Sequence, residues 1–510
     1  MKIKHILTGM AIAMCAGSAG AQDSLSYSVT AYGGGATGEF APYMLGSWNY
    51  GKTPMGGTAL IDAAVHKDFD MNRRFSWEAG VEAVAGYSHH TAYQRYDAAS
   101  GAWTSHNEGP APVWLQQLYA SVKWRCLFLS AGMKERGSAL VDDNLSSGDL
   151  VQSNNSRPIA QVRAGLVDFQ DIPLTRGWVQ IAGCLAYGKM SDNDYLRNHY
   201  NYWNSHIATG VLYTYKNIYF RSNPAKPLSV TIGIQSAGTF GGTTWWYRKG
   251  EEWKSVKSRR NLRAFFDMLI PSLGNGDGYV DGSHLGSWDF KARYAFAGGH
   301  SLEGYFQWLW EDGSSMAKRN KWDGLWGISY HRTSPGTHIV DGAAIEYIDF
   351  RDQSGPMHWA PGDDPGTTIV NEATGGDNYY NNSTLNAFAN YGMSMGSPFP
   401  VAPVYNTDGF IQFKHTRTRG FHAAATGSIS RLWRWKAAVS HAVAWGSGRL
   451  HYNTPLHNTS AMVETSWNAA SITPGLSAKA AIAFDAGKLR GDNFGAMVTV
   501  AYTGNITFRK

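Results

Sequence analysis

The sequence predicts an all-β fold, a transmembrane antiparallel β-barrel of roughly 18 strands with long extracellular loops and room for a short helical plug. Hydrophobic and polar residues alternate over most of the chain, aromatic residues make up 13% of it, and charged residues only 16%. An ordinary secreted domain carries more charge and fewer aromatic residues. The apolar faces are rich in Ala and bracketed by Trp, Tyr and Phe, so they suit a wall that meets lipid better than a dry sandwich core.

The first residues have the features of a secretory signal peptide. A basic start is followed by a short apolar core over 6–14, and small residues precede a cleavage site after Ala21. We therefore expect a signal peptide over 1–21 and a single barrel domain over 22–510. Beyond the signal no run of about 18 apolar residues occurs, so no membrane-spanning helix is expected.

Alternation is clearest in three segments. In FSWEAGVEAVAGY, residues 75–87, aromatic and aliphatic side chains occupy one face, and Ser, Glu and Gly occupy most of the other. The segments 287–296 and 301–311 sort in the same way. Similar segments recur near 58–66, 113–124, 178–188, 228–238, 339–349, 408–416, 435–445, 460–468 and 476–485. A tilted strand of about ten residues crosses a bilayer, so these segments are long enough to span one.

The polar faces of these segments carry charges that a dry core would leave unpaired. They are Glu78, Glu82, Asp289, Lys291, Arg293, Glu303 and Glu311. In a barrel, such side chains point into the lumen. They could form an ion-pair network that closes the lumen, or they could line a pore and set its selectivity. The sequence leaves both alternatives open.

The C-terminal segment places an apolar residue or Gly at every second position from Phe494 to Phe508. A last strand that ends in an aromatic residue resembles the sorting signal of Gram-negative outer-membrane barrels. A barrel of this class implies outer-membrane lipid, lipopolysaccharide and the barrel assembly machinery as partners. The net charge of +6 is too weak and too dispersed to predict a nucleic-acid partner.

Long segments without alternation separate the predicted strands. They fall at 88–112, 133–177, 189–205, 239–286, 312–322, 351–407 and 446–459. On barrels of this class, long loops face the outside and tight turns face the periplasm. Residues 251–270 are the best helix candidate, with an apolar face that ends before Pro271. That helix could plug the lumen, lie in the periplasm or pack on a loop.

Three stretches together resemble a known family. They are SSGDLVQSNNSRPIAQVRAGLVDFQDIPLTRGWVQIAG (146–183), GYFQWLWEDGSSMAKRNKWDGLWG (304–327) and DQSGPMHW…GGDNYYNN (352–382). Their sequence and spacing are similar to those of Wzi-type capsule assembly proteins, in the form found among Bacteroidetes-like bacteria. The resemblance implies an outer-membrane barrel that acts as a surface lectin and anchors capsular polysaccharide to the cell.

Sugar recognition needs planar hydrogen-bonding groups for hydroxyls and flat aromatic rings for the C–H faces of pyranoses. Two of these stretches offer both. The candidate carbohydrate-binding residues are Trp310, Glu311, Asp312, Trp322, Asp323, Trp326, Asp377, Asn378, Tyr379, Tyr380, Asn381 and Asn382. The competing interpretation is that Asn and Gly shape turns, while Trp and Tyr anchor the barrel at the membrane interface.

Catalytic and metal-binding patterns are weak. Residues 392–396, GMSMG, match the G-x-S-x-G string of serine hydrolases, but they lie in a Gly/Asn/Pro loop without the strand and helix that position such a serine. The histidines lack zinc-ligand spacing, and GNGDGYVDG at 274–282 lacks the closing Glu of an EF-hand. We therefore expect no catalytic residue, metal or cofactor. Whether Cys126 and Cys184 form a bridge is left open.

The sequence thus predicts a non-catalytic outer-membrane lectin of a Gram-negative bacterium that binds and anchors capsular or exopolysaccharide at the cell surface. The alternative is an outer-membrane porin or substrate-specific diffusion channel, which requires an open lumen.

Overall fold

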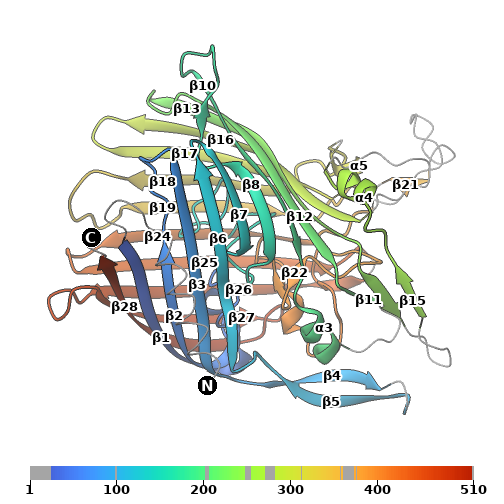
Figure 1. Cartoon of the computed structure of the whole chain (residues 1–510). Coiled ribbons are helices and arrows are strands. Elements are labelled where there is room, and N and C mark those ends of the chain that lie inside the picture. Colours follow the sequence, from blue (N-terminus) through green and yellow to red (C-terminus); the bar gives the residue numbers. More distant parts are fainter. Residues whose placement is uncertain are drawn as a thin grey trace.

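A computed structural model describes residues 24–97, 100–200, 206–246, 254–269, 282–311, 313–316, 318–355, 358–359, 373–374, 376–448 and 450–507. The expected signal peptide lies outside these residues, as does Phe508. Nineteen strands join in one antiparallel sheet, and all but the two-residue β9 (Gln170–Asp171) form the wall of a barrel (Figure 1). The wall strands are β1 (Ser24–Phe40), β2 (Met55–Lys67), β3 (Phe75–Ser88), β6 (Val113–Trp124), β7 (Leu127–Met133), β8 (Ala160–Leu166), β10 (Val179–Lys189), β12 (Leu212–Ser222), β13 (Leu228–Phe240), β16 (Ser283–Phe296), β17 (His300–Trp310), β18 (Gly324–Arg332), β19 (Gly342–Asp349), β24 (Thr418–Ser428), β25 (Trp433–Gly446), β26 (His451–Asn468), β27 (Leu476–Gly487) and β28 (Asn493–Thr507). The predicted fold class is confirmed.

The wall closes where the first strand meets the last. β1 pairs with β2 on one side, with Ser26 opposite His66, and with β28 on the other, with Ser24 opposite Thr507. Each wall strand therefore has a partner on both sides, which is the condition under which a sheet can lie in hydrocarbon. Among the described residues, no helix is long and apolar enough to cross a bilayer.

Alternating exposure shows which way each strand faces. In β19 the carboxylate-bearing Glu346 is 1% exposed, whereas its neighbour Ile345 is 67% exposed. At the two ends of β3, the aromatic residues Phe75 and Tyr87 are 60% and 61% exposed. Polar positions thus face the lumen, and apolar positions with aromatic ends form the outer wall, as the hydrocarbon core and its two interfaces require.

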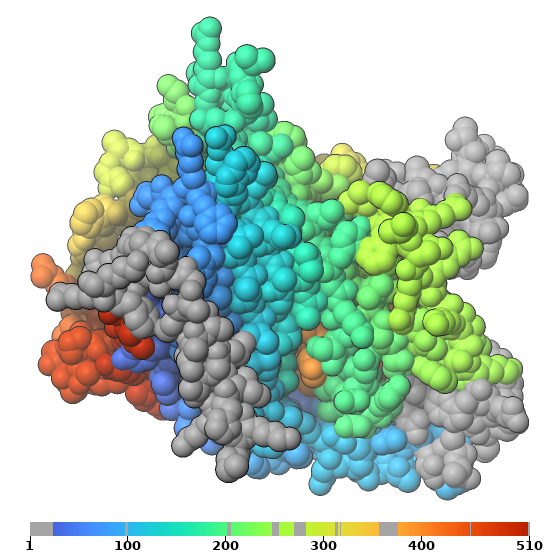
Figure 2. All heavy atoms as spheres, in the orientation of Figure 1, coloured from blue at the N-terminus to red at the C-terminus, as the bar shows by residue number. Residues whose placement is uncertain are grey.

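The two ends of the barrel differ in loop length. Short turns join β6 to β7 and β16 to β17, at the end where β1 begins and β28 stops. Long loops at the opposite end hold α2 (Tyr43–Gly46), β4 (Thr91–Asp97), β5 (Ala102–Glu108), α3 (Asn193–His199), β11 (His206–Thr209), β14 (Thr243–Trp246), β15 (Lys254–Lys257), α4 (Leu262–Asp267), α5 (Gly313–Met316), β20 (His358–Trp359), β21 (Ala373–Thr374), β22 (Ala389–Asn390), β23 (Met393–Ser394) and the 3-10 helix η1 (Pro403–Tyr405). Several of them stand out from the wall on the right of Figure 2, where β15 and α4 are yellow-green. On outer-membrane barrels the long-loop end is extracellular.

Two long loop segments fold back into the lumen. Residues 138–159, after β7, and residues 377–416, between β19 and β24, contribute many members of the largest apolar cluster, including Leu150, Val151 and Phe399. These three side chains are 0%, 0% and 1% exposed. The part of the lumen that these segments occupy is therefore packed with chain.

Side chains on the inner face of the wall hold the inserted segments by hydrogen bonds. Glu346 accepts the backbone N–H of Ser147 at 2.7 Å. Asp149, on the same inserted segment, accepts from the side-chain amides of Gln235 and Gln307 at 2.9 and 2.8 Å. Because these buried groups are paired with the wall, the packing is specific rather than a loose filling.

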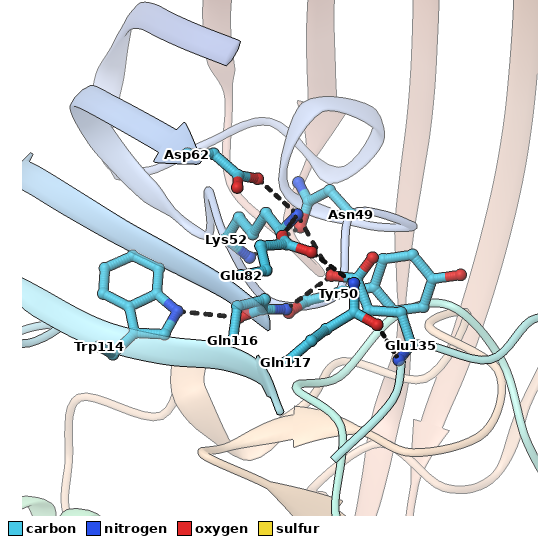
Figure 3. A network of polar contacts seen from close by, with 9 residues as sticks. All are labelled: Asn49, Tyr50, Lys52, Asp62, Glu82, Trp114, Gln116, Gln117 and Glu135. Atoms are coloured by element: carbon cyan, nitrogen blue, oxygen red, sulfur yellow. Dashed lines mark hydrogen bonds and ion pairs between the residues drawn. The ribbon is translucent and has the colours of Figure 1, made fainter. Parts of the chain in front are cut away.

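A buried ion cluster joins the loop after β1 to the wall (Figure 3). Lys52 Nζ lies 2.8 Å from Asp62 of β2, 2.5 Å from Glu82 of β3 and 3.2 Å from Glu135 of the loop after β7. Gln116 of β6 donates to Glu135 at 2.8 Å. One ammonium group therefore bridges three carboxylates from three parts of the chain, and we call these four charged residues the Lys52 cluster.

Other charges predicted to face the lumen are also paired. Glu78 binds Lys134 at 2.7 Å, and Glu303 binds Lys291 at 3.2 Å. Asp289 instead accepts hydrogen bonds from neutral donors. Of the two alternatives that the sequence left open, these contacts favour a network that closes the lumen.

The helix predicted over 251–270 is shorter. The structure places β15 at Lys254–Lys257 and begins α4 only after Asn261, whose side chain accepts the N–H of Ala264 at 3.0 Å and caps the helix. The Phe265 ring lies 5.1 Å from that of Tyr187, centre to centre. The helix therefore packs at the long-loop rim, and the expectations of a plug or a periplasmic helix are wrong.

Two further expectations differ from the structure. The segment near 408–416, predicted as a strand, is an irregular part of the inserted segment 377–416. The predicted loop 133–177 contains the wall strand β8, whose seven residues are too few to show a clear alternation. Cys126 lies in the turn after β6, and Cys184 lies in β10. Both cysteines are free, so they form no bridge.

Candidate functional site

The two stretches predicted to bind sugar are distant in sequence and meet at the long-loop end. Glu311 accepts the backbone N–H of Asn378 at 3.1 Å. The hydroxyl of Tyr379 donates to Asp323 at 3.1 Å and accepts from the amide of Asn320 at 2.8 Å. The structure thus joins them into one unit.

Three of the predicted aromatic rings are buried in this unit. Trp310, Tyr379 and Tyr380 are 1%, 0% and 2% exposed. The Tyr380 hydroxyl donates to the carbonyl of Leu150 in the lumen at 2.8 Å. The three rings pack inside the molecule and position the loops, so their faces are not open to a ligand. Of the other predicted residues, Asp312 lies outside the described residues.

Asn381 and Asn382 shape the backbone. Asn381 exchanges two hydrogen bonds with the main chain of Phe413, both 2.9 Å long. Asn382 accepts the N–H groups of Thr384 and Leu385 at 2.9 and 2.8 Å, which forms a tight turn. For these two residues the contacts fit the competing, turn-forming interpretation.

The other five predicted residues line a cavity of about 910 Å³. They are Trp322, Asp323, Trp326, Asp377 and Asn378. The remaining walls are formed by Lys321, Tyr347, Asp349, Arg351, Asp352, Gln353, Gly355, Gly376, Arg417, Gly448 and His451. The volume lies in the range of ligand-binding clefts. We call this space the rim cavity.

Stacked aromatic rings form one side of the rim cavity. Trp322 stacks on Trp308 with 5.1 Å between ring centres, and Trp326 stacks on Phe306 with 3.8 Å between centres. Phe306 and Trp308 belong to the outward face of β17, so this aromatic ledge of four rings sits on the outer wall at the rim. Trp322 is 63% exposed at this position, where its ring can contact the membrane interface or a ligand.

Gln353 is the least satisfied polar group of the cavity wall. Its side chain is 1% exposed, and neither Oε1 nor Nε2 has a hydrogen-bond partner among the residues that the structure describes. A buried amide without partners costs free energy, and natural structures rarely contain one without a reason. A ligand with vicinal hydroxyl groups would supply both a donor and an acceptor. The sequence prediction missed Gln353, although it lies in the stretch DQSGPMHW that carries the family resemblance.

The backbone around Gln353 is strained. Lys321, Gln353 and Ser354 have φ angles of 51°, 47° and 61°, in the left-handed region that residues other than Gly seldom adopt. Hydrogen bonds hold this geometry, including one from the Ser354 hydroxyl to Asp377 at 2.7 Å. Such strain concentrates at functional sites because the surrounding structure must maintain it.

Asp323 ties the cavity wall together. Its carboxylate accepts the N–H groups of Gln353 and Asp352 at 2.8 and 3.2 Å, in addition to the hydroxyl of Tyr379. Burial raises the pKa of Asp323 to about 7, since the charged form loses its hydration. The carboxyl group therefore acts as a buried brace between three segments and changes its charge near neutral pH.

The charged groups of the cavity are mostly paired. Lys321 binds Asp352 at 2.7 Å, and Arg351 forms a two-point contact with Asp349 at 2.8 and 2.6 Å. Arg417 donates through Nε to the carbonyl of Arg351 at 3.0 Å, and it forms no ion pair with any described residue. Besides these groups the lining carries the carboxyl groups of Asp323 and Asp377, so its charges are mixed in sign.

The serine of the GMSMG string lies elsewhere. Ser394 belongs to the two-residue strand β23, is 0% exposed, and its carbonyl accepts from Asn155 of the inserted segment at 3.0 Å. This is an internal packing position and lacks the strand-to-helix elbow that exposes a hydrolase nucleophile.

Comparisons with known proteins bear on the fold. The chain matches no protein-family model and no curated protein. Among solved structures it is similar to Wzi, an outer-membrane protein involved in group 1 capsule assembly in Escherichia coli and described as a carbohydrate-binding β-barrel. The TM-score is 0.55 at 12% identity, over 95% of this chain and 85% of that one.

Channel proteins give weaker similarities. OccAB2 of Acinetobacter baumannii has a TM-score of 0.47 at 9% identity, over 96% of this chain and 98% of that one. OprD of Pseudomonas aeruginosa has a TM-score of 0.44 at 9% identity, over 95% of both chains. At these low sequence identities, structural similarity supports a shared fold and no shared function. The chain therefore has the fold of an outer-membrane β-barrel.

Proposed function

We propose that this chain is a non-catalytic outer-membrane lectin that binds capsular or exopolysaccharide at the cell surface and keeps it attached to the cell. The observation that carries the proposal is the rim cavity. It is lined at the long-loop end by Trp322, whose ring is exposed, and by Gln353, whose buried amide has no partner among the described residues.

The Trp322 ring and the Gln353 amide are the two kinds of group that bind sugars, a flat aromatic face and a planar hydrogen-bonding group. An indole face can cover the C–H face of a pyranose, which is apolar. In this proposal the buried Gln353 side chain turns toward the cavity when a sugar binds, donates to one hydroxyl group and accepts from its neighbour, which relieves the cost of the unpaired amide. Asp377 and Asn378 contribute polar edges to the same cavity. Weak binding per sugar unit would be raised by many contacts along one polymer.

The packed lumen supports an anchor over a diffusion channel. Asp149 of the inserted segment, with Gln235 and Gln307 of the wall, forms a hydrogen-bonded bridge inside the barrel. A channel needs a continuous path for water, and the inserted segments 138–159 and 377–416 occupy part of the space inside the barrel. We therefore expect little conductance when the purified barrel is inserted into a planar bilayer.

The test compares two tryptophans of similar exposure. Trp322 is 63% exposed in the rim cavity, and Trp178 is 59% exposed at the short-turn end. In a capsule-producing host, Trp322→Ala should release the polymer into the medium, whereas Trp178→Ala should leave it on the cells. Cell-bound and shed polymer are measured by fractionating the culture, and heat-modifiable migration checks that each variant is folded.

Either of two outcomes would overturn the proposal. One is that the two variants retain the polymer equally well. The other is that removing the whole protein leaves the polymer on the cells while uptake of a small solute falls, which would identify a channel.

A further inference from the structure

A cluster of guanidinium groups lies at the edge of the rim cavity, and two of its members, Arg351 and Arg417, also line that cavity. Arg417 precedes β24 and Arg419 is its second residue, so the two share one face of an extended strand. Arg351 follows the end of β19, which pairs with β24. Trp445, near the end of β25, lies within reach of two of these groups. The guanidinium carbons of Arg351 and Arg419 are 5.6 and 5.4 Å from its ring centre.

Alternating exposure places Arg419 on the lipid side of the wall. In β24, His422 bonds to the inserted segment and faces the lumen, whereas Arg419 and Phe421 face outward. Phe421 is 57% exposed and lies two residues farther from the loops than Arg419. On the neighbouring strand, the outward-facing Ile345 is 67% exposed. The order from the loops toward the middle of the wall is therefore cation, aromatic ring, aliphatic side chain.

That order matches the layers of a bilayer leaflet. Aliphatic side chains lie against the hydrocarbon, aromatic rings lie at its boundary, and cations lie at the level of the phosphate groups. The cations here are not all neutralised. Asp349 pairs with Arg351, but Arg417 and Arg419 form no ion pair within the described part of the chain.

We propose that Arg417 and Arg419 bind a phosphate group of a phosphorylated glycolipid in the outer leaflet, with the Trp445 ring beside them. Guanidinium groups favour phosphate because their N–H groups match its oxygens in pairs. The lipid would be held against the wall directly below the rim cavity. Arg419 does not line that cavity, so lipid binding and polymer binding can be separated by mutation.

The experiment measures lipid retention by native mass spectrometry. The full-length barrel is reconstituted in zwitterionic nanodiscs that contain a small fraction of lipid A, and is released into mild detergent. We expect bound lipid A on the unaltered protein, and a loss of about tenfold for the double variant Arg417→Gln with Arg419→Gln. Arg419→Gln alone should lose part of the lipid, and Arg419→Lys should lose less because the charge is kept.

The matched control is Arg332, which faces outward on the wall at the opposite, short-turn end. Arg332→Gln should retain lipid A like the unaltered protein. Dephosphorylated lipid A should not be retained, and free inorganic phosphate should not displace the lipid, since the acyl chains hold it at the wall.

Three results would overturn this inference. They are equal lipid loss in Arg332→Gln, full retention in the folded double variant, and equal retention of the dephosphorylated lipid. Polymer retention by Arg419→Gln cells tests the proposed lectin function separately, because that function depends on Trp322 and Gln353 and predicts no change.

Discussion

The Lys52 cluster and the rim cavity are two polar regions of the same barrel. They differ in whether their buried side chains have partners. Lys52 has 9% of its side chain exposed and contacts three carboxylates within 3.2 Å. Gln353 is 1% exposed and has no side-chain hydrogen bond to any residue that the structure describes. Both regions lie on the long-loop side of the wall, and both involve loops that close over strand ends.

The difference in pairing indicates which region has all its buried polar groups satisfied without a ligand. In the Lys52 cluster each of the three carboxyl groups contacts the ammonium group of Lys52, so every member already has a partner and the cluster holds the loop after β1 against the wall. Around Gln353, strained backbone is maintained next to an amide that still lacks partners. A fold that keeps such a group buried is prepared for a polar ligand. Mutations in each of the two regions can test this difference.

The largest effect is expected from Lys52→Ala. This change leaves Asp62, Glu82 and Glu135 as buried carboxylates without their cation, so we expect a loss of about 3–5 kcal/mol in stability. Thermal unfolding in detergent, followed by heat-modifiable migration, measures it. Lys488→Ala, in the exposed turn after β27, is the matched control and should change little.

Lys52→Ala also tests the closing of the lumen. If the cluster holds the loop after β1 in place, the folded fraction of the variant should show more frequent conducting events in planar bilayers than the unaltered barrel. Unchanged thermal unfolding together with unchanged conductance would mean that the cluster has no structural role.

A pair of glutamine variants examines the cavity more finely. Gln353→Leu removes an amide without partners and should leave stability unchanged or slightly raised, while affinity for the polymer falls about tenfold. Gln307→Leu removes an amide that pairs with Asp149 and Leu150, so it should lower stability and leave affinity unchanged. Thermal unfolding and polymer titration of the purified barrel measure both quantities. The opposite pattern in the two variants would reverse the assignment of the two regions.

Much of the fold is visible in the sequence because the membrane imposes a simple rule on each strand. Residues 75–87, 287–296 and 301–311 alternate strongly, and they coincide with β3, β16 and β17. A short wall strand such as β8 has too few residues for the alternation to be recognised in the sequence. The helix boundary was missed because a single cap, Asn261, determines where α4 begins.

The candidate site was predictable in location and less so in detail. Composition marked the right loops, and five of the chosen residues line one cavity. The rings of Tyr379 and Tyr380 gave the same signal as Trp322, yet they are buried because the loop that holds them folds into the lumen. Nothing in the local sequence separates these cases. Gln353 stands out only because its surroundings leave it unpaired, which is a property of the tertiary structure.

The smallest expected effect is a pH dependence of the cavity wall through Asp323. In the folded wall, burial raises its pKa to about 7, whereas an opened, solvated loop has the ordinary value of 3.8. Between pH 3.8 and about pH 7, Asp323 therefore holds its proton in the closed wall and loses it in the opened loop. The stability of the closed wall falls as the pH rises through this range, and it levels off above about pH 7. From about pH 5.5 to about pH 7.5 we expect a change on the order of 1 kcal/mol in the free energy of local opening. Hydrogen exchange at the amides of Asp352 and Gln353, corrected for the intrinsic rate, measures it. Asp323→Asn cannot ionise and should abolish the trend; if the trend persists in that variant, another group governs the wall.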